Sequence, residues 1–374
     1  MSPGDTHHMR PAPLTIDLAL EGGGSKGIAL NAALAEIFER GHVVRRLVGS
    51  SAGAIAAGLV AAGFTGKDLL QMSLGRTADG LPLFSEYVAE PVVADSASAE
   101  QALTDVQVAS LRLPADLGRR LTTARAALAF LDTGGFVSGQ GFVGWLVRTL
   151  EAKAPGLSRL TLGQLHARGG HHLTITVTDT TAKRLRALNH LSAPDCPLVA
   201  AVRMSISIPL LFGEVKWRAE WGNYLGEDLT GHVMVDGGML SNLPLAFILP
   251  STNALVLKLM GPPPEGPAFP VGLTLDSSLE VPGAPPAANQ PFLSTQFAAT
   301  RLGQRLSALA DTMLQGTDLT LSDTSPVPLC RLPVKGYWAT EFDMSLPRAE
   351  ALVRAARAST AAYFDVLEAQ AGRR

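Results

Sequence analysis

The segment IDLALEGGGSKGIAL, residues 16–30, constrains the fold more than any other part of the chain. Its first residues belong to an apolar run, LTIDLAL (14–20), that has the β-branched and apolar content of a buried strand. The run stops at three consecutive glycines, and a helical pattern then extends from 26 to 40 and ends at Gly41. A strand that turns directly into a helix in this way is typical of α/β proteins.

The same alternation of strand and helix continues along the chain. A second strand is expected at 43–48, followed by a nearly all-apolar, buried helix at 52–62. Further strands are expected at 173–178, 232–235 and 254–259, and an amphipathic helix with Pro347 in its first turn is expected over 346–371. The alternation predicts an α/β fold in which helices cover both faces of a mostly parallel sheet.

Three segments depart from this pattern, and none of them reads as a domain linker. Residues 65–165 are largely helical in pattern and include an inserted surface segment at 98–120. Residues 261–293 are rich in proline and glycine and are expected to form a long loop. The polar, proline-bearing residues 1–13 lack the basic start and apolar middle of a secretory signal, and we expect a flexible tail.

The glycine turn contains a G-x-G-x-x-G pattern, formed by Gly22, Gly24 and Gly27, which is the fingerprint of many dinucleotide sites. That fingerprint also needs a carboxylate near the end of the second strand, which reads RRLVG and has none. A phosphate loop needs Ser or Thr after its lysine, whereas Lys26 is followed by Gly27. The turn therefore indicates a general anion site, built from backbone N–H groups at a helix start together with Lys26.

A serine in a G-x-S-x-G pattern follows the second expected strand. Gly49, Ser51 and Gly53 lie at the junction with the helix at 52–62, and small residues on both sides suit a sharp turn. The positive end of that helix would favour negative charge that develops at the Ser51 hydroxyl. These features favour a nucleophilic serine, and a structural N-cap serine is the alternative.

The base that would activate Ser51 is not an obvious histidine. In α/β-hydrolases the catalytic histidine comes last in the chain, after the acid, but no histidine follows His232 here. Asp236 ends an expected strand and precedes Gly237 and Gly238, at the sheet edge where such proteins bind ligands. It is either a carboxylate of the site or a turn aspartate of the common Asp-Gly type.

In chain order, the three motifs resemble those of the patatin-like phospholipase family. Residues 22–27 match its glycine-rich loop, 49–53 match its serine turn, and 236–238 match its aspartate motif. The segments VRMSISIPLLF (202–212) and SNLPL (241–245) add to the likeness. The resemblance implies a three-layer α/β/α fold with a mostly parallel central sheet.

The resemblance also implies how the chain is divided. It covers residues 14–250, which would form the catalytic core after the tail at 1–13. The remaining residues, 251–374, are then expected to pack on the same domain, with the proline-rich loop and the terminal helix.

The activity that the resemblance implies is hydrolysis of lipid acyl esters, of the phospholipase A or lysophospholipase type, through an acyl-enzyme. Ser51 would be the nucleophile and Asp236 its base. The expected oxyanion donors are Gly22, Gly23 and Gly24, and the expected anion contact is Lys26, where many members have arginine. Five further glycines support the three motifs: Gly27, Gly49, Gly53, Gly237 and Gly238.

Elementary chemistry agrees with this assignment. An ordinary carboxylate is a weak base for a serine hydroxyl, so the site has to raise the pKa of Asp236 by burial or stabilise the oxyanion strongly. An alcohol leaving group asks less of the resulting acid than an amine does, which favours esters over peptides. This chemistry needs no metal and no cofactor, and we expect neither.

Composition limits the partners. The net charge is −2, from 31 basic and 33 acidic residues without a basic run, which argues against nucleic acid and against strong attraction to anionic lipid. No stretch of 18 apolar residues is present, so no transmembrane helix is expected. Cys196 and Cys330 share no redox or metal-ligand spacing and favour reduced thiols in a cytoplasmic protein, although export without a cleaved signal stays open.

Other functions could use the same residues. A transacylase or a thioesterase would use the same dyad, and a non-catalytic scaffold could keep the fold, although the intact motifs argue against it. We expect peripheral contact with a lipid surface, made by the loop at 261–293 as a cover of the acyl pocket. A disordered excursion is the alternative for that loop, and the sequence does not identify a protein activator.

Overall fold

The computed structural model describes residues 12–88, 135–169, 171–251, 253–262, 265–286 and 327–373. Its strands are β1 (Thr15–Leu20), β2 (Val43–Gly49), β3 (Gly135–Val137), β4 (His172–Asp179), β5 (Arg184–Leu188), β6 (Leu210–Phe212), β7 (Val215–Lys216), β8 (Val233–Asp236), β9 (Phe269–Asp276) and β10 (Leu329–Pro333). Its α-helices are α1 (Ile28–Glu39), α2 (Ala52–Ala61), α3 (Gly66–Leu74), α6 (Gln140–Lys153), α7 (Leu162–Ala167), α8 (Leu198–Ser205), α9 (Ala254–Met260) and α12 (Leu346–Ala371).

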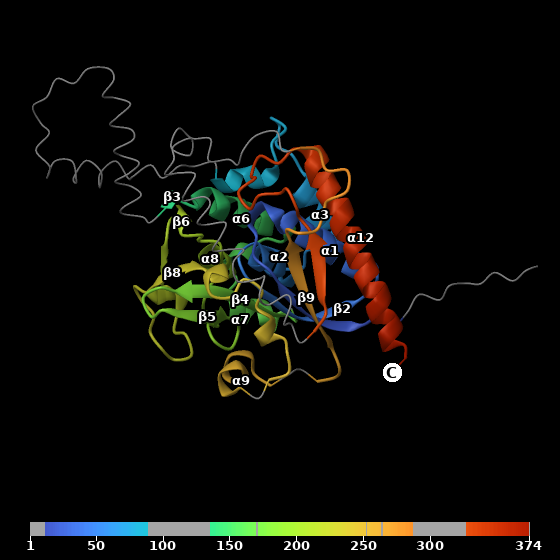
Figure 1. Cartoon of the computed structure of the whole chain (residues 1–374). Helices are drawn as coiled ribbons and strands as arrows, with labels where there is room; N and C mark the ends of the chain where they lie inside the picture. The colour runs from blue at the N-terminus through green and yellow to red at the C-terminus, as the bar shows by residue number, and fades with distance from the viewer. Residues whose placement is uncertain are drawn as a thin grey trace, which may run out of the picture.

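One central sheet organises the chain (Figure 1). Its strand order is β10-β9-β1-β2-β4-β8-β7, and β5 also pairs with β4. Neighbouring strands from β10 to β4 run parallel, whereas β5, β8 and β7 pair antiparallel. The protein is therefore an α/β protein with a mostly parallel central sheet, as the alternation of strands and helices predicts.

Both faces of the sheet are covered. In β1 every residue from Ile16 to Leu20 is buried, although successive side chains of a strand point to opposite faces. The helices α1 and α12 pack against each other and reach β10, while α2 and α8 pack over β4 in the middle of the sheet (Figure 1). None of the helices within the described ranges is long and apolar enough to cross a bilayer.

The strand registers bring the three sequence motifs to one place. Leu20, at the end of β1, lies level with Gly49, at the end of β2. Gly49 in turn pairs with Ile175 of β4. Because β8 runs antiparallel to β4, its last residue, Asp236, pairs with Val177, two positions farther along β4. The glycine loop, the serine turn and the aspartate therefore meet at one edge of the sheet.

Most of the expected elements are present. The strands expected at 14–20, 43–48, 173–178 and 232–235 and the helices expected at 52–62 and 346–371 all occur within a residue or two of their expected ends. The helix expected at 26–40 begins as a short 3-10 turn, Gly24–Gly27, and continues as α1. The inserted segment at 98–120 lies outside the described residues, and the division at residue 250 stays a prediction.

The strand expected at 254–259 is wrong, because these residues form the helix α9. The Asn253 side chain caps this helix by accepting a hydrogen bond from the Leu255 N–H at 2.8 Å. Leu255 is 61% exposed and Leu257 is 41% exposed, so this apolar run lies at the surface instead of in the sheet. A short apolar run does not by itself distinguish a buried strand from an exposed helix.

The expectation of a long covering loop at 261–293 is also wrong over its central part. Residues 269–276 form β9, which lies between β1 and β10 in the sheet. We expected this loop to contact lipid, but the side chains of Val271, Leu273 and Leu275 within it are buried in the core. Pro270 and Gly272 lie within this core strand, and the other described prolines and glycines of the segment flank it. Residues 287–293 lie outside the described residues.

A buried charge cluster secures the opposite end of β1. Asp17 is 1% exposed, and its Oδ2 pairs with Nη2 of Arg45 at 2.7 Å and of Arg46 at 2.6 Å. Burial alone would raise the pKa of Asp17, but hydrogen bonds from the two guanidinium groups hold it below its ordinary value. Arg46 also donates to the carbonyl of Ile248 at 2.8 Å, so the cluster connects β1 and β2 to a distant segment.

Replacing Asp17 by Asn should destabilise the fold strongly, because it leaves the buried Arg46 without its carboxylate. We expect a loss of about 3–5 kcal/mol in the free energy of unfolding, measured by urea denaturation. The matched control is Glu280→Gln, at an ion pair with Lys335 in which both side chains are more than half exposed. That change should cost less than about 1 kcal/mol, and equal losses in both variants would contradict the assignment.

Candidate active site

Ser51 lies on the sharp turn between β2 and α2. Its φ is 50° and its ψ is −119°, a backbone conformation that residues other than glycine rarely adopt. A Cβ on Gly49 would collide with the carbonyl of Gly53, and a Cβ on Gly53 would collide with the carbonyl of Leu20. The backbone N–H of Ser51 donates to Oγ of Ser205 at 3.0 Å. The turn thus holds the Ser51 side chain at the N-terminus of α2.

Asp236 ends β8 and is fully buried. Its Oδ1 accepts a hydrogen bond from the Gly238 N–H at 2.7 Å, and its own N–H donates to the carbonyl of Ser207 at 2.9 Å. Its Oδ2 is buried and has no partner in full hydrogen-bond geometry among the described residues. Burial raises the pKa of Asp236 to about 7, and the Ser51 hydroxyl and the Gly238 N–H offset only part of this rise.

The glycine loop approaches Ser51 from the end of β1. A Cβ on Gly22 would lie 2.9 Å from the Cβ of Ser51, so only glycine permits this approach. The Gly22 N–H already donates to the carbonyl of Asn242 at 3.1 Å. The N–H groups of Gly23 and Gly24 have no such partner in the described part of the chain. Among the three glycines, Gly23 and Gly24 therefore keep donors available for an anion.

A further donor comes from the helix that follows the serine. The N–H of Ala52, the first residue of α2, has no hydrogen-bond partner among the described residues. It lies in the same pocket lining as Gly24 and Ser51. The sequence analysis did not single out Ala52, although it occupies the position after the serine that supplies an oxyanion donor in α/β-hydrolases.

Lys26 lies beside the glycine loop and is only 3% exposed. Its Cε is 3.5 Å from the position that a Cβ on Gly23 would take. At the next position, a Cβ on Gly27 would lie 2.9 Å from the Cβ of Ala52, so Gly27 lets the loop pack closely on α2. The expected role of Lys26 as an anion contact stays a prediction.

Glu21 and Asn242 hold the loop in place, and the sequence analysis missed both roles. The Asn242 amide donates to Oε1 of Glu21 at 3.0 Å. Oε2 of Glu21 accepts from the hydroxyl of Thr274 at 2.5 Å and from the N–H of Leu275 at 2.6 Å. This buried network joins the glycine loop to β9 and to the segment after Asp236. The sequence indicated these roles only through position, because Glu21 directly precedes the glycine loop and Asn242 follows the aspartate motif.

The two adjacent serines have different surroundings. The Ser50 hydroxyl is fully buried, shares a hydrogen bond with Oγ1 of Thr176, and donates to the carbonyl of Ser241 at 2.5 Å. Ser51, in contrast, lines the pocket. Ser50 therefore fixes the turn to β4, and Ser51 is the serine that a substrate can reach.

The pocket in front of Ser51 is mainly apolar. Its empty volume, with the open mouth included, is about 770 Å³. Its polar lining comes from a few groups, among them Ser25 and Asn31. The apolar walls include Ile55, Leu59, Trp145, Ile208, Phe212 and Phe342. A long apolar group attached to a polar reacting centre fits this distribution.

No histidine lines the pocket in the part of the chain that the structure describes. His232 lies just before β8, where its Nδ1 is 3.0 Å from Oδ2 of Asp179. The Nδ1 of His171 is bonded to the carbonyl of Val44 at 2.7 Å. The imidazoles of His171 and His232 are therefore bonded to groups away from Ser51. Asp236 is the titratable side chain that lies beside Ser51.

Comparison with known proteins gives a family match, a similar protein sequence and weakly similar solved structures. The family model described as patatin-like phospholipase matches residues 18–249. The uncharacterized protein YqhO of Bacillus subtilis (strain 168) is 26% identical over 356 residues, which are 93% of this chain and 98% of YqhO. The crystal structure of VipD from Legionella pneumophila has a TM-score of 0.45 at 16% identity, over 94% of this chain and 68% of VipD. The type III effector ExoU has a TM-score of 0.39 at 17% identity, over 96% of this chain and 54% of ExoU.

The buried carboxyl of Asp236 should make stability depend on pH. Its pKa is about 7 in the folded protein and close to 3.8 when the chain is unfolded. Between these values the folded state binds more protons, so this group makes the fold less stable as pH rises from 4 to 7. Asp236→Asn should remove that loss and stabilise the protein at pH 8 by an amount on the order of a few kcal/mol.

Urea denaturation of both proteins at pH 5 and pH 8 measures this difference. The gain from Asp236→Asn should be clearly larger at pH 8 than at pH 5, because at pH 5 only part of the loss of stability has developed. A difference that does not change with pH would show that the carboxyl titrates normally in the folded state.

Proposed function

Because the chain belongs to the patatin-like phospholipase family, we propose that it hydrolyses lipid acyl esters with Ser51 as the nucleophile and Asp236 as its base. The observation that carries the proposal is the fully buried carboxyl of Asp236, with a pKa of about 7, beside a serine held at a positive φ. A carboxyl with this pKa accepts a proton more readily than an ordinary aspartate and still ionises near neutral pH.

In the first step, Oγ of Ser51 attacks the ester carbonyl carbon while its proton passes to the Asp236 carboxylate. The carbonyl oxygen becomes an oxyanion, which accepts hydrogen bonds from the N–H groups of Gly23, Gly24 and Ala52. Donors fixed in this way are worth a few kcal/mol each, because they need no reorganisation as the charge develops. Collapse of this intermediate breaks the ester bond, and the leaving alkoxide takes the proton from Asp236.

The second step repeats this chemistry with water. Asp236 accepts a proton from a water molecule as its oxygen attacks the acyl-serine carbonyl. The intermediate expels Oγ of Ser51, which recovers its proton from Asp236, and the fatty acid leaves. The dyad returns to its initial state, and the net reaction is hydrolysis of one ester bond.

The pocket supports a lipid substrate. Its apolar walls would hold an acyl chain next to Ser51, with the polar lining left for the ester and the head group. The phospholipase A or lysophospholipase type, and peripheral contact with a lipid surface, are parts of the proposal. A transacylase or a thioesterase would use the same dyad, so the products formed in the presence of alcohol acceptors distinguish these enzymes from a hydrolase.

Ser51→Ala should abolish fatty-acid release from phospholipid vesicles and from a soluble short-chain ester, and also labelling by a fluorophosphonate. Asp236→Asn should lower kcat by several orders of magnitude, because the proton acceptor is lost. The control is His232→Gln, which should keep activity within about tenfold, since its imidazole pairs with Asp179 away from the pocket. Full turnover by Ser51→Ala, or equal losses for His232→Gln and Asp236→Asn, would overturn the dyad.

The pH dependence of the reaction should follow the ionisation of Asp236. The proton acceptor has to be ionised in the free enzyme, and burial raises the pKa of Asp236 to about 7. We therefore expect kcat/KM to rise with pH and to level off above an apparent pKa near 7. Measurement between pH 4.5 and 9 tests this, and a plateau that already begins at pH 5 would exclude Asp236 as the base.

A further inference from the structure

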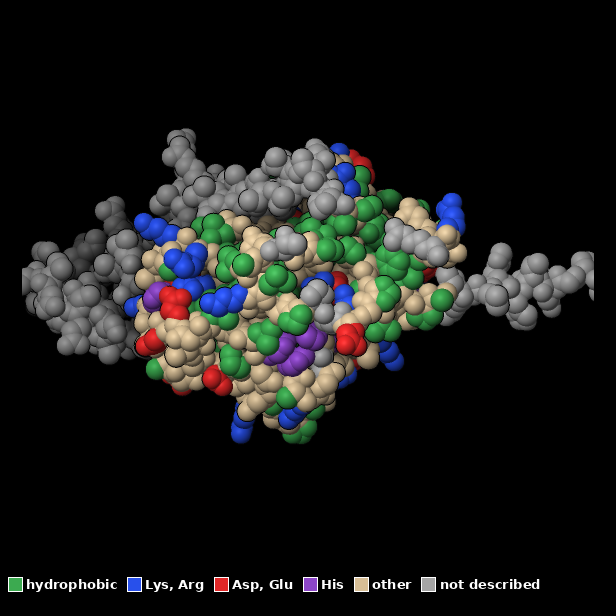
Figure 2. All heavy atoms as spheres, turned by 90° about the horizontal axis from the view of Figure 1, so that it is seen from below, with side chains coloured by type: hydrophobic (Ala, Val, Ile, Leu, Met, Phe, Trp, Pro, Cys, Tyr) green, Lys and Arg blue, Asp and Glu red, His purple; other side chains and the backbone are tan. Residues whose placement is uncertain are grey.

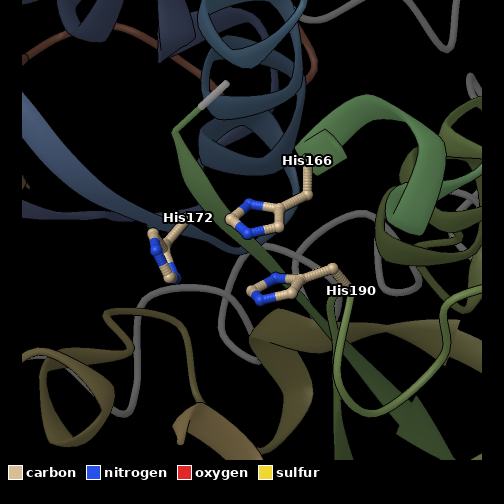
Figure 3. A group of neighbouring side chains, drawn as sticks. All are labelled: His166, His172 and His190. Carbon is tan, nitrogen blue, oxygen red and sulfur yellow. The ribbon is translucent and has the colours of Figure 1, made fainter. Parts of the chain in front are cut away.

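Three histidines that the proposed chemistry does not use come together at the other end of β4. His166 lies on α7, His172 is the first residue of β4, and His190 lies in the turn after β5. One ring nitrogen of each lies within 4.8 Å of those of the other two. Figure 3 shows the three rings facing one another from these separate segments. The sequence analysis found no such group, because the three positions have no common spacing along the chain.

The three rings are in direct contact. His166 and His190 are stacked, with 3.6 Å between ring centroids and 16° between ring planes. His172 meets both rings at steep angles, with centroids 4.7 Å from His166 and 5.1 Å from His190. All three side chains are partly exposed, and a group of histidine side chains is visible at the surface in Figure 2. An ion from solvent can therefore reach the group.

The segments that carry these histidines are well anchored. A capping box between Thr161 and Gln164 fixes the start of α7. The Asn189 side chain accepts from the N–H groups of Leu191 and Ser192 at 2.9 Å and donates to the carbonyl of Leu259 at 2.9 Å. This network holds the turn that carries His190. The third position, His172, pairs with Arg46 in the sheet.

His166 has a buried ring nitrogen, Nδ1, without a hydrogen-bond partner in the described residues. A buried polar atom in this state is costly unless something binds it. The guanidinium groups of Arg45 and Arg46, whose charges act on His172, are paired with Asp17.

We propose that His166, His172 and His190 bind a divalent transition-metal cation of the zinc type through one imidazole nitrogen each. Imidazole suits zinc, copper and nickel, and three histidines leave one tetrahedral position for water. Bonds of about 2.0–2.1 Å would bring the ligand nitrogens to about 3.3 Å from one another. The stacked rings of His166 and His190 turn about their side-chain torsions to reach this geometry, which partly exposed side chains allow.

This metal site is separate from the serine site. His172 precedes Val177, the β4 residue that pairs with Asp236, by five positions, which corresponds to about 16 Å along a strand. The cation would join α7, β4 and the turn after β5, and its role is to stabilise these segments. Its binding does not depend on the proposed ester hydrolysis, so each proposal can fail without the other.

Calorimetric titration of the full-length, chelator-treated protein with ZnCl2 tests the site. We expect one zinc ion per chain and a higher melting temperature in its presence, because a ligand that binds only the folded state stabilises it. His166→Gln and His190→Gln should each weaken binding by at least about tenfold and remove the thermal shift, since each lacks one of three ligands. Melting curves without zinc verify that both variants are folded.

Two control variants make the result specific. His171→Gln changes the residue next to His172. The Nδ1 of His171 is bonded to the carbonyl of Val44, so this variant should bind zinc as the original protein does. His7→Gln/His8→Gln removes the histidine pair near the N-terminus and should also bind normally. No zinc binding, binding unchanged in His166→Gln and His190→Gln, or binding lost with His7 and His8 would overturn the proposal.

Discussion

Desolvation of the Asp236 carboxyl is the constraint on which the arrangement of the site depends. A fully buried carboxyl resists ionisation, and here one N–H, from Gly238, is the hydrogen-bond donor that clearly meets it. More donors would stabilise the carboxylate and lower its basicity, and exposure to water would have the same effect. The strained turn places the Ser51 hydroxyl beside this carboxyl. Burial thus makes Asp236 a stronger base at neutral pH, and it also makes the folded protein less stable when this carboxyl is ionised.

Close approach of backbone segments explains why glycines dominate the motifs. A Cβ on Gly49, Gly53 or Gly237 would collide with the backbone of an adjacent segment, and a Cβ on Gly24 would collide with the carbonyl of Ala339. The three motifs come from the ends of β1, β2 and β8, which the registers align at one edge of the sheet. Packing of this density fixes the positions of Ser51, Asp236 and the loop donors together, so that none of them moves independently.

The sequence predicted the parts of the molecule whose signal is local. The Ser51 turn and the glycine loop combine a strand pattern, required glycines and a helix pattern within a few residues, so their placement followed directly. The parts it missed depend on tertiary contacts. Residues 254–260 form a helix at the surface instead of a strand. Residues 269–276 form a core strand, because pairing with β1 outweighs their local proline and glycine content. The Glu21–Asn242 network and the three-histidine group join residues that are far apart in the chain, and no spacing rule connects them.

The position of β9 affects how the chain can fold during synthesis. Although it comes late in the sequence, β9 lies directly beside β1, the first strand. A ribosome that has released the serine turn and the aspartate motif has still not released the partner for one edge of β1. Until residue 276 emerges, that edge presents free backbone donors and acceptors, which invite pairing with other chains. The sheet therefore closes late, through contacts that span about 250 residues, and such long-range pairing makes folding slow. A fragment that stops at residue 249, where the family match ends, would contain every proposed catalytic residue on an incomplete sheet.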